Sequence, residues 1–199
     1  MTFDEYNIKL ENVMHSLSSN PNGEIMLKIG EDALVMIRQR ILTSGINAEG
    51  AKYAPYSNKP MLSGCKNFIQ AADCEKLVGS KDKRRNLKWA TIQRNGKNYR
   101  LFYIPGGYKQ FRELQGRQTG FVDFSFSGDM WRDITIVSNT SEHNAGKVKI
   151  GAKREENDEK LAGNTKRRGD ILKLSTEEID DLSKTYELEL IQIFSNNGL

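Results

Sequence analysis

The stretch KWATIQRNGKNYRLFYI, residues 88 to 104, most restricts how this chain can fold. Two runs rich in β-branched and aromatic residues flank Asn95-Gly96, and this dipeptide is a strong signal for a two-residue hairpin turn. DITIVSN and KVKIGAK alternate apolar and polar residues around the turn-rich TSEHNAG, which predicts a second hairpin. The sequence therefore predicts antiparallel strands in its middle.

Amphipathic helices are expected before and after these hairpins. Apolar residues recur at helical spacing from Phe3 to Leu17 and from Ile25 to Ile41, and Gly45 is a natural stop for the second helix. Ser175-Thr176 before two glutamates predicts the start of a last helix. The polar segment KREENDEKLAGNTKRRGD, residues 153 to 170, is expected to be an exposed loop. The predicted class is α+β, with an antiparallel sheet of hairpins packed against long N- and C-terminal amphipathic helices.

A length of 199 residues suits one domain with extensions. The expected division is an N-terminal helical extension over residues 1–20 and a single α+β domain over residues 21–199. That domain carries a basic loop or insertion around residues 54–88. This segment contains prolines and many charged residues and shows no clear helix or strand periodicity.

Charge is unevenly distributed along the chain. Between Glu75 and Arg117 there are twelve basic and three acidic residues, whereas from Asp170 onward there are seven acidic and two basic residues. This asymmetry favours a polyanionic partner or head-to-tail contacts between copies of the protein. Two solvated faces are the alternative explanation.

Catalytic and metal-binding patterns are not found in the sequence. His15 falls on the first helix and His143 in a hairpin turn, while Cys65 and Cys74 lack further ligands nearby, so reduced thiols and no zinc are expected. The acidic residues near the last helix suggest either a divalent-metal cluster or, better, favourable charge at a helix N-terminus; they are Asp170, Glu177, Glu178, Asp180 and Asp181. No apolar run reaches the ~20 residues of a membrane span, and no signal peptide is expected. We expect no cofactor and no enzyme activity.

Basic and aromatic residues are interleaved in the middle of the chain. A cluster of four cations precedes Trp89, and Tyr99 and Tyr103 flank Arg100 on the first hairpin; the four are Lys81, Lys83, Arg84 and Arg85. Such a pattern can bind a nucleic-acid backbone without reading its sequence. The aromatic residues can instead supply core on at least one face of the hairpin.

The ordered set of segments resembles the bacteriophage virion-morphogenesis or tail-completion proteins, over roughly Ile25 to Phe194. The matching segments are IRQRILTSGINAEGAKYAPYS, then Leu114, Thr119, Gly120, Gly128, Asp129 and Met130, then KVKIGAK, and then Ala162 to Ile179. Each motif is short, and it is their order that carries the resemblance.

This resemblance implies a structural protein of a tailed-phage virion, at the neck or the proximal tail. Such a subunit would form a six- or twelve-fold ring around the DNA channel, with portal or adaptor and tail proteins as partners. It would be assembled in the cytoplasm of the host bacterium, without a membrane. The four cations at 81–85 would then face channel DNA or an acidic partner.

Within this hypothesis, GINAEGAKYAPYS is interpreted as a subunit-interface loop, through Gly45, Gly50, Tyr53, Pro55 and Tyr56. Glycine and proline define a loop path, and tyrosines are frequent contact residues at interfaces. A surface loop whose tyrosines pack onto the core is the alternative. Two other functions remain open: a sequence-independent nucleic-acid-binding module using residues 76–117, and a hydrolase or nuclease using Glu142, His143 or the acidic tail.

Overall fold

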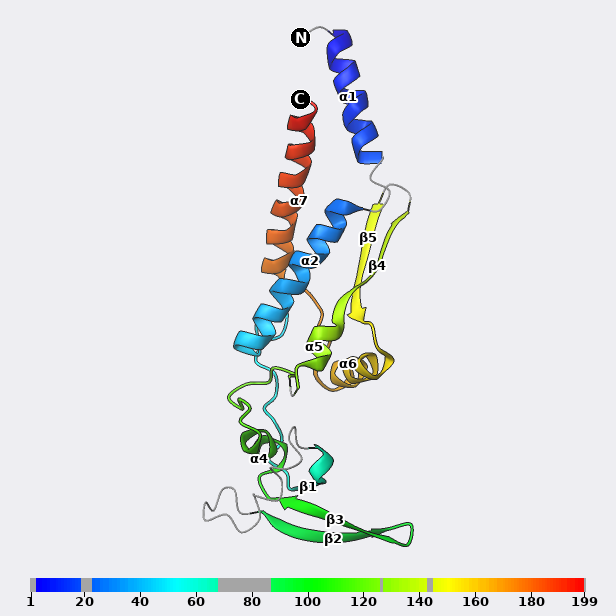
Figure 1. Cartoon of the computed structure of the whole chain (residues 1–199). Coiled ribbons are helices and arrows are strands. Elements are labelled where there is room, and N and C mark those ends of the chain that lie inside the picture. The colour runs from blue at the N-terminus through cyan, green and yellow to red at the C-terminus, as the bar shows by residue number, and fades with distance from the viewer. Residues whose placement is uncertain (1–2, 19–22, 68–86, 126, 143–144, 199) are drawn as a thin grey trace. The chain divides into compact units, whose positions relative to one another are not determined.

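The computed structural model describes residues 3–18, 23–67, 87–125, 127–142 and 145–198 (Figure 1). The chain divides into two compact units: unit 1 comprises Met1–Lys52 and Asp123–Leu199, and unit 2 comprises Tyr53–Val122. Unit 2 is thus inserted into the sequence of unit 1. These boundaries differ from the expected extension at 1–20 and single domain at 21–199.

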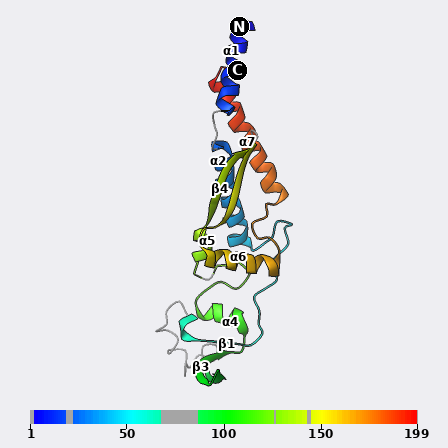
Figure 2. The same ribbon diagram turned by 90° about the vertical axis from the view of Figure 1, so that its right-hand side faces the viewer.

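Unit 1 contains most of the helices and one two-stranded antiparallel sheet. Its elements are α1 (Phe3–Ser18), α2 (Glu24–Gln39), α5 (Asp129–Asp133), β4 (Ile134–Glu142), β5 (Ala145–Ala152), α6 (Glu155–Arg168) and α7 (Thr176–Asn196). Helix α2 contacts both strands, and α7 lies alongside α2 (Figures 1 and 2). Together the elements make an α+β arrangement of terminal helices and small antiparallel sheets, which is the predicted class.

The apolar stripe predicted on α2 forms the core of unit 1. Ala33, Leu34 and Ile37 are buried, and the stripe continues into Ile41 within a π-helical turn, Arg40–Ser44. Gly45 then adopts φ 62° and ends the helix, as expected. On the sheet side, a side chain at Gly30 would place its Cβ 2.6 Å from Val148 Cγ1, so the helix backbone approaches β5 closely there.

Unit 2 is built on a three-stranded antiparallel sheet in the order β1-β3-β2. Its elements are β1 (Met61–Ser63), β2 (Lys88–Arg94), β3 (Lys97–Ile104) and α4 (Gly107–Leu114). Asn95 and Gly96 have φ values of 50° and 72°, which suits the expected Asn-Gly turn. The first hairpin is therefore confirmed with Lys88 paired to Tyr103 and Arg94 to Lys97.

Two expectations are wrong in the described residues. Residues 155 to 168 form the helix α6, although this segment was expected to be a loop; only Asn157 and Leu161 of the helix are buried, so its apolar periodicity is weak. Cys65 is disulfide-bonded, which differs from the reduced thiol expected; Cys74 lies outside the described residues.

Candidate functional site

The predicted interface loop does not present its tyrosines as contact surface. Tyr53 and Tyr56 are 7% and 6% exposed, so in the single chain both tyrosines pack onto the core, as the alternative interpretation of this loop expected. Pro55 between them is exposed. The burial of Tyr56 has a clear cause within unit 2.

Helix α4 covers Tyr56. The ring of Tyr108 meets Tyr56 edge-on with centroids 5.6 Å apart, and the buried guanidinium of Arg112 lies 4.3 Å from the Tyr56 ring centroid. Ser57 accepts a backbone hydrogen bond of 3.0 Å from Lys109, and a Cβ at Gly107 would lie 2.2 Å from the backbone oxygen of Lys59. The segment YAPYS therefore packs against α4 and holds this helix in place within unit 2.

The glycine part of the predicted loop makes a compact local turn in unit 1. Asn47 Oδ1 accepts from the backbone N–H groups of Glu49 (3.1 Å) and Ala51 (2.8 Å), and Gly50 has φ 77°. The turn therefore explains why the segment GINAEGA contains Asn47, whose side chain accepts these bonds, and Gly50, which adopts the positive φ. The four predicted DNA-facing cations, Lys81, Lys83, Arg84 and Arg85, lie outside the described residues.

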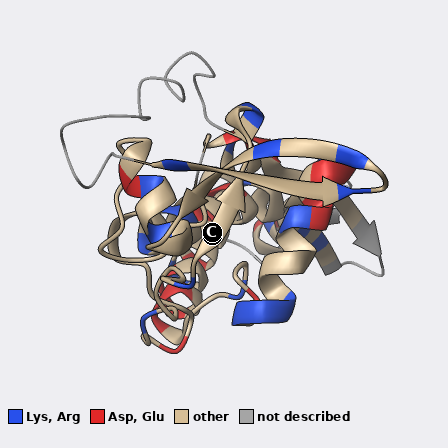
Figure 3. Ribbon diagram, turned by 90° about the horizontal axis from the view of Figure 1, so that it is seen from below, with Lys and Arg blue, Asp and Glu red and all other residues tan. Residues whose placement is uncertain are grey.

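The division into units separates the charges more sharply than the linear sequence does. Unit 2 holds fourteen lysines and arginines against four acids, a net charge of +10, while unit 1 holds sixteen against twenty-two, a net charge of −6. The β2–β3 hairpin carries Lys88, Arg94, Lys97 and Arg100 and no acidic residue (Figure 3). Unit 2 is thus suited to a polyanionic partner.

One face of the hairpin combines cations with exposed tyrosines, and we call it the tyrosine face. Because paired residues of an antiparallel sheet share a face and alternate residues share a face, the register places five residues together: Lys88, Arg94, Lys97, Tyr99 and Tyr103. Tyr99 and Tyr103 are 45% and 42% exposed. The sequence contained both tyrosines, but the register was needed to place them on one face with these cations.

The opposite face of the hairpin packs within the chain at the end that holds Trp89 and Phe102. Trp89 stacks on Phe102 with ring centroids 4.0 Å apart, and the Arg100 guanidinium lies 4.1 Å from the Trp89 ring centroid. Phe102 is fully buried. The two faces therefore differ: this one supplies aromatic core, as the sequence alternative allowed, whereas both tyrosines of the other face are exposed.

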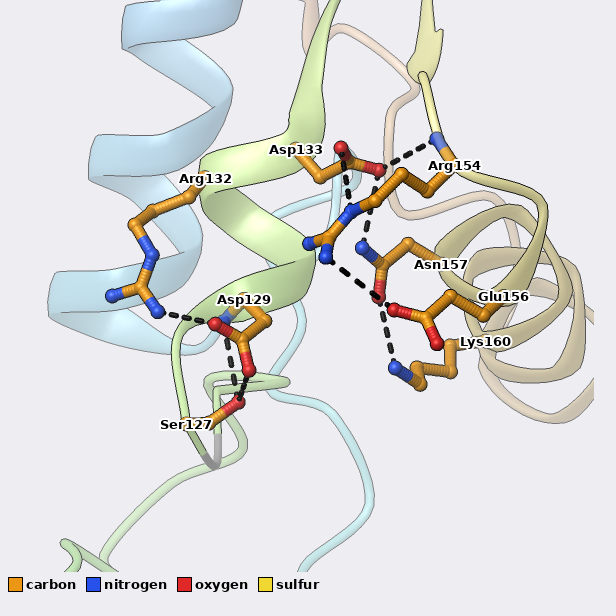
Figure 4. A network of polar contacts seen from close by, with 8 residues as sticks. All are labelled: Ser127, Asp129, Arg132, Asp133, Arg154, Glu156, Asn157 and Lys160. Carbon is orange, nitrogen blue, oxygen red and sulfur yellow. Dashed lines mark hydrogen bonds and ion pairs between the residues drawn. The ribbon is translucent and has the colours of Figure 1, made fainter.

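A polar network in unit 1 joins α5 to α6 (Figure 4). Asp133 accepts hydrogen bonds from the Arg154 backbone N–H (2.9 Å), the Arg154 Nε (3.1 Å) and the Asn157 Nδ2 (3.1 Å). Lys160 donates to Asn157 Oδ1 at 2.9 Å. The backbone N–H of Arg154 holds the pKa of Asp133 below its usual range, with further help from Asn157 and Arg154 side chains. Each of these contacts fixes the first turn of α6, which is a structural role.

The acidic residues near α7 are mostly engaged within the chain. Glu178 forms a capping box with Ser175 and pairs with Arg40, and Asp181 pairs with Lys184. Among the residues that the structure describes, no group of three or more histidine, cysteine or acidic side chains is arranged to hold a metal. His15 is exposed on α1, and His143 lies outside the described residues.

Apolar side chains of α7 remain exposed in the single chain. Only Glu178 and Leu182 of this helix are buried, whereas Ile179, Tyr186 and Phe194 are 50%, 42% and 37% exposed. Steps of seven and eight residues place these three on one side of the helix, which we call the α7 stripe. The sequence predicted the helix and its apolar periodicity, but not that part of its apolar surface would stay uncovered.

No helix in the described ranges combines the length and the apolar character needed to cross a bilayer. Comparison of the chain with protein-family models, with curated proteins and with solved structures gives no match.

Proposed function

We propose that this chain is a non-enzymatic structural subunit of a tailed-phage virion. In this role it forms a ring at the neck or proximal tail, as a head–tail connector or tail-completion protein between the capsid portal and the tail. The class of virion protein comes from the resemblance of the ordered sequence segments. The structure supports the assembly role through one observation, the apolar surface that unit 1 leaves exposed on its helices.

This exposed surface is larger than the α7 stripe alone. On α1, Ile8 and Met14 are 58% and 63% exposed, and on α2 Val35 is 59% exposed. Single apolar side chains such as these are common on protein surfaces, but an apolar stripe such as that of α7 marks contact with another chain. We propose that neighbouring subunits cover them, so that the long helices complete in the ring the helix-on-sheet packing predicted from the sequence.

The charge of unit 2 supports the same proposal. A ring around DNA needs cationic surface toward the phosphates, and unit 2 carries the net charge of +10. The proposed location is therefore the virion, with assembly in the cytoplasm of the host bacterium and with portal, adaptor and tail proteins as neighbours. No catalytic group or cofactor has a part in this function.

The alternative function, a sequence-independent nucleic-acid-binding module, is favoured by the acid-free β2–β3 hairpin. The two functions differ in what the purified chain does alone. A binding module stays monomeric and binds DNA with a steep salt dependence, whereas a ring subunit self-associates through apolar surface.

The mass distribution of the purified full chain tests the proposal. Analytical ultracentrifugation over a wide concentration range, with negative-stain images of any large species, is expected to show closed rings with a central hole. The images would also give the symmetry. A chain that stays monomeric at every concentration, with and without DNA, would contradict the ring and leave the binding module as the better explanation.

A further inference from the structure

We propose that the tyrosine face of the β2–β3 hairpin binds nucleic acid with unpaired bases, either a single strand or the unpaired end of a duplex. The cations would contact phosphates while Tyr99 and Tyr103 stack against bases. This inference goes beyond the ring function and does not depend on it, because it concerns a surface of unit 2 alone.

The positions of the cations give the first reason. Arg94 and Lys97 are paired directly across the turn and share a face, and the hairpin contains no acidic residue that could separate their charges. Like charges opposite each other destabilise a hairpin. A bound polyanion would relieve this repulsion, so the arrangement suits a phosphate backbone.

The exposure of the tyrosines gives the second reason. Tyr99 and Tyr103 are four residues apart on one strand, about 13 Å along it, so each can contact a separate base. Lys88 is paired with Tyr103, and Lys97 lies two residues from Tyr99 on the same face. Cations that alternate with exposed aromatic rings are typical of single-strand binding, where stacking accepts any base. A paired duplex offers phosphates but no free base faces except at its ends.

The acidic unit 1 of another copy is the competing partner, and several of its acids already pair within the chain. On α7, Glu178 pairs with Arg40, Asp181 with Lys184, and Glu189 with Lys28. Moreover, a purely electrostatic contact between copies would not need exposed tyrosines. Nucleic acid can therefore contact both the cations and the tyrosines of this face, whereas an acidic protein surface would account only for the cations.

The test measures binding of the full chain to three fluorescein-labelled DNA probes by anisotropy: a 20-nucleotide single strand, a blunt duplex, and the same duplex with a single-stranded overhang. We expect tighter binding of the single strand and of the overhang than of the blunt duplex. Tyr99→Leu with Tyr103→Leu should weaken single-strand binding roughly tenfold or more, without changing the salt dependence or the blunt-duplex affinity. Tyr99→Phe with Tyr103→Phe should bind as the parent does, because the rings remain.

Charge variants complete the test. Arg94→Gln with Lys97→Gln should lower both the affinity and the slope of log affinity against log salt, the slope by about 1.4 for a single strand. The matched control removes two exposed cations of unit 2 that lie off the hairpin, Lys59→Gln with Lys66→Gln. Circular dichroism confirms that each variant is folded.

Three outcomes would overturn the proposal. The first is a leucine pair that binds single strands as tightly as the phenylalanine pair. The second is an equal loss in the Lys59 and Lys66 control. The third is loss of self-association, with nucleic-acid binding unchanged, in the Arg94 and Lys97 variant; this would assign the face to contacts between copies. The first two results leave ring formation through the α7 stripe untouched, whereas the third would move the contact between copies to the hairpin, so failures of the two proposals remain distinguishable.

Discussion

The Nε of Arg40 lies 2.8 Å from Glu178 Oε1, and the two side chains are only 9% and 10% exposed. Arg40 also donates to the backbone oxygens of Lys173 (2.7 Å) and Ile46 (3.2 Å), while Glu178 Oε2 accepts from the Ser175 backbone N–H at 2.7 Å. One buried ion pair therefore joins the end of α2 to the start of α7 and completes the N-terminal cap of α7.

Arg40→Met should destabilise unit 1 by about 3–5 kcal/mol, because it leaves the carboxylate of Glu178 buried without its cation. The measurement is urea unfolding followed by the fluorescence of Trp131, in a background where Trp89, the other tryptophan, is phenylalanine. Lys184→Met is the control, since it breaks an exposed pair with Asp181 and should cost far less. Similar losses in the two variants would contradict a structural role for the buried pair.

Gly107→Ala should destabilise unit 2 by more than about 2 kcal/mol. The residue has φ 62°, and a Cβ would lie 2.2 Å from the Lys59 backbone oxygen, which cannot move aside as a side chain can. Gly116→Ala is the matched control, because its φ is 66° but nothing lies within 4 Å of the added Cβ; about 1 kcal/mol is expected there. Trp89 fluorescence, with Trp131 replaced by phenylalanine, reports on this unit.

Gly30→Ala tests the close approach of α2 to β5. Alanine gains about 1 kcal/mol over glycine in a helix, but its Cβ would meet Val148 Cγ1 at 2.6 Å, so we expect net destabilisation. In a Val148→Ala background the same change should stabilise the protein. A double-mutant cycle measured by urea unfolding should give a coupling of about 0.5–3 kcal/mol. Additive effects would show that helix and strand do not meet at this point.

Asp133 should make stability depend on pH. The Arg154 backbone N–H, with Asn157 and the Arg154 side chain, lowers the folded-state pKa of Asp133 below its ordinary value of 3.8. Its stabilising contribution is therefore fully present above that value and is lost as pH falls through the lower folded-state pKa. Asp133→Asn should be less stable than the parent near neutral pH, and the difference should shrink in urea titrations below about pH 4. The control is Glu159→Gln, which removes one carboxylate from an exposed position on α6 and leaves the hydrogen bonds of Asp133 in place.

The α7 stripe should control self-association. Tyr186→Glu with Phe194→Glu introduces two charges into the exposed apolar stripe and should dissociate any ring while leaving the unfolding midpoint nearly unchanged, since both side chains are exposed. Gln192→Glu with Ser195→Glu adds the same charge to other exposed positions of α7 and should leave the rings intact. Sedimentation velocity of the two double variants and of the parent protein measures how much of each is assembled. Rings that survive the first pair would place the subunit contact elsewhere.

Local signals in the sequence determined most of the secondary structure. Asn95-Gly96 defined the first hairpin because few dipeptides adopt two successive positive φ values easily. Ser175 and Glu178 marked the start of α7 because a capping box depends only on residues three apart. In both cases neighbouring residues alone carry the interaction.

Tertiary structure decided what depends on residues far apart in the sequence. The sequence does not predict helix α6, because the helix buries few residues and its first turn is anchored by Asp133, about twenty residues earlier. The sequence does not predict the burial of Tyr56, because its contacts Tyr108 and Arg112 lie about fifty residues away. Strand register, the partners of each helix and the burial of each side chain depend on such distant contacts. Local sequence patterns do not specify which of these distant contacts form.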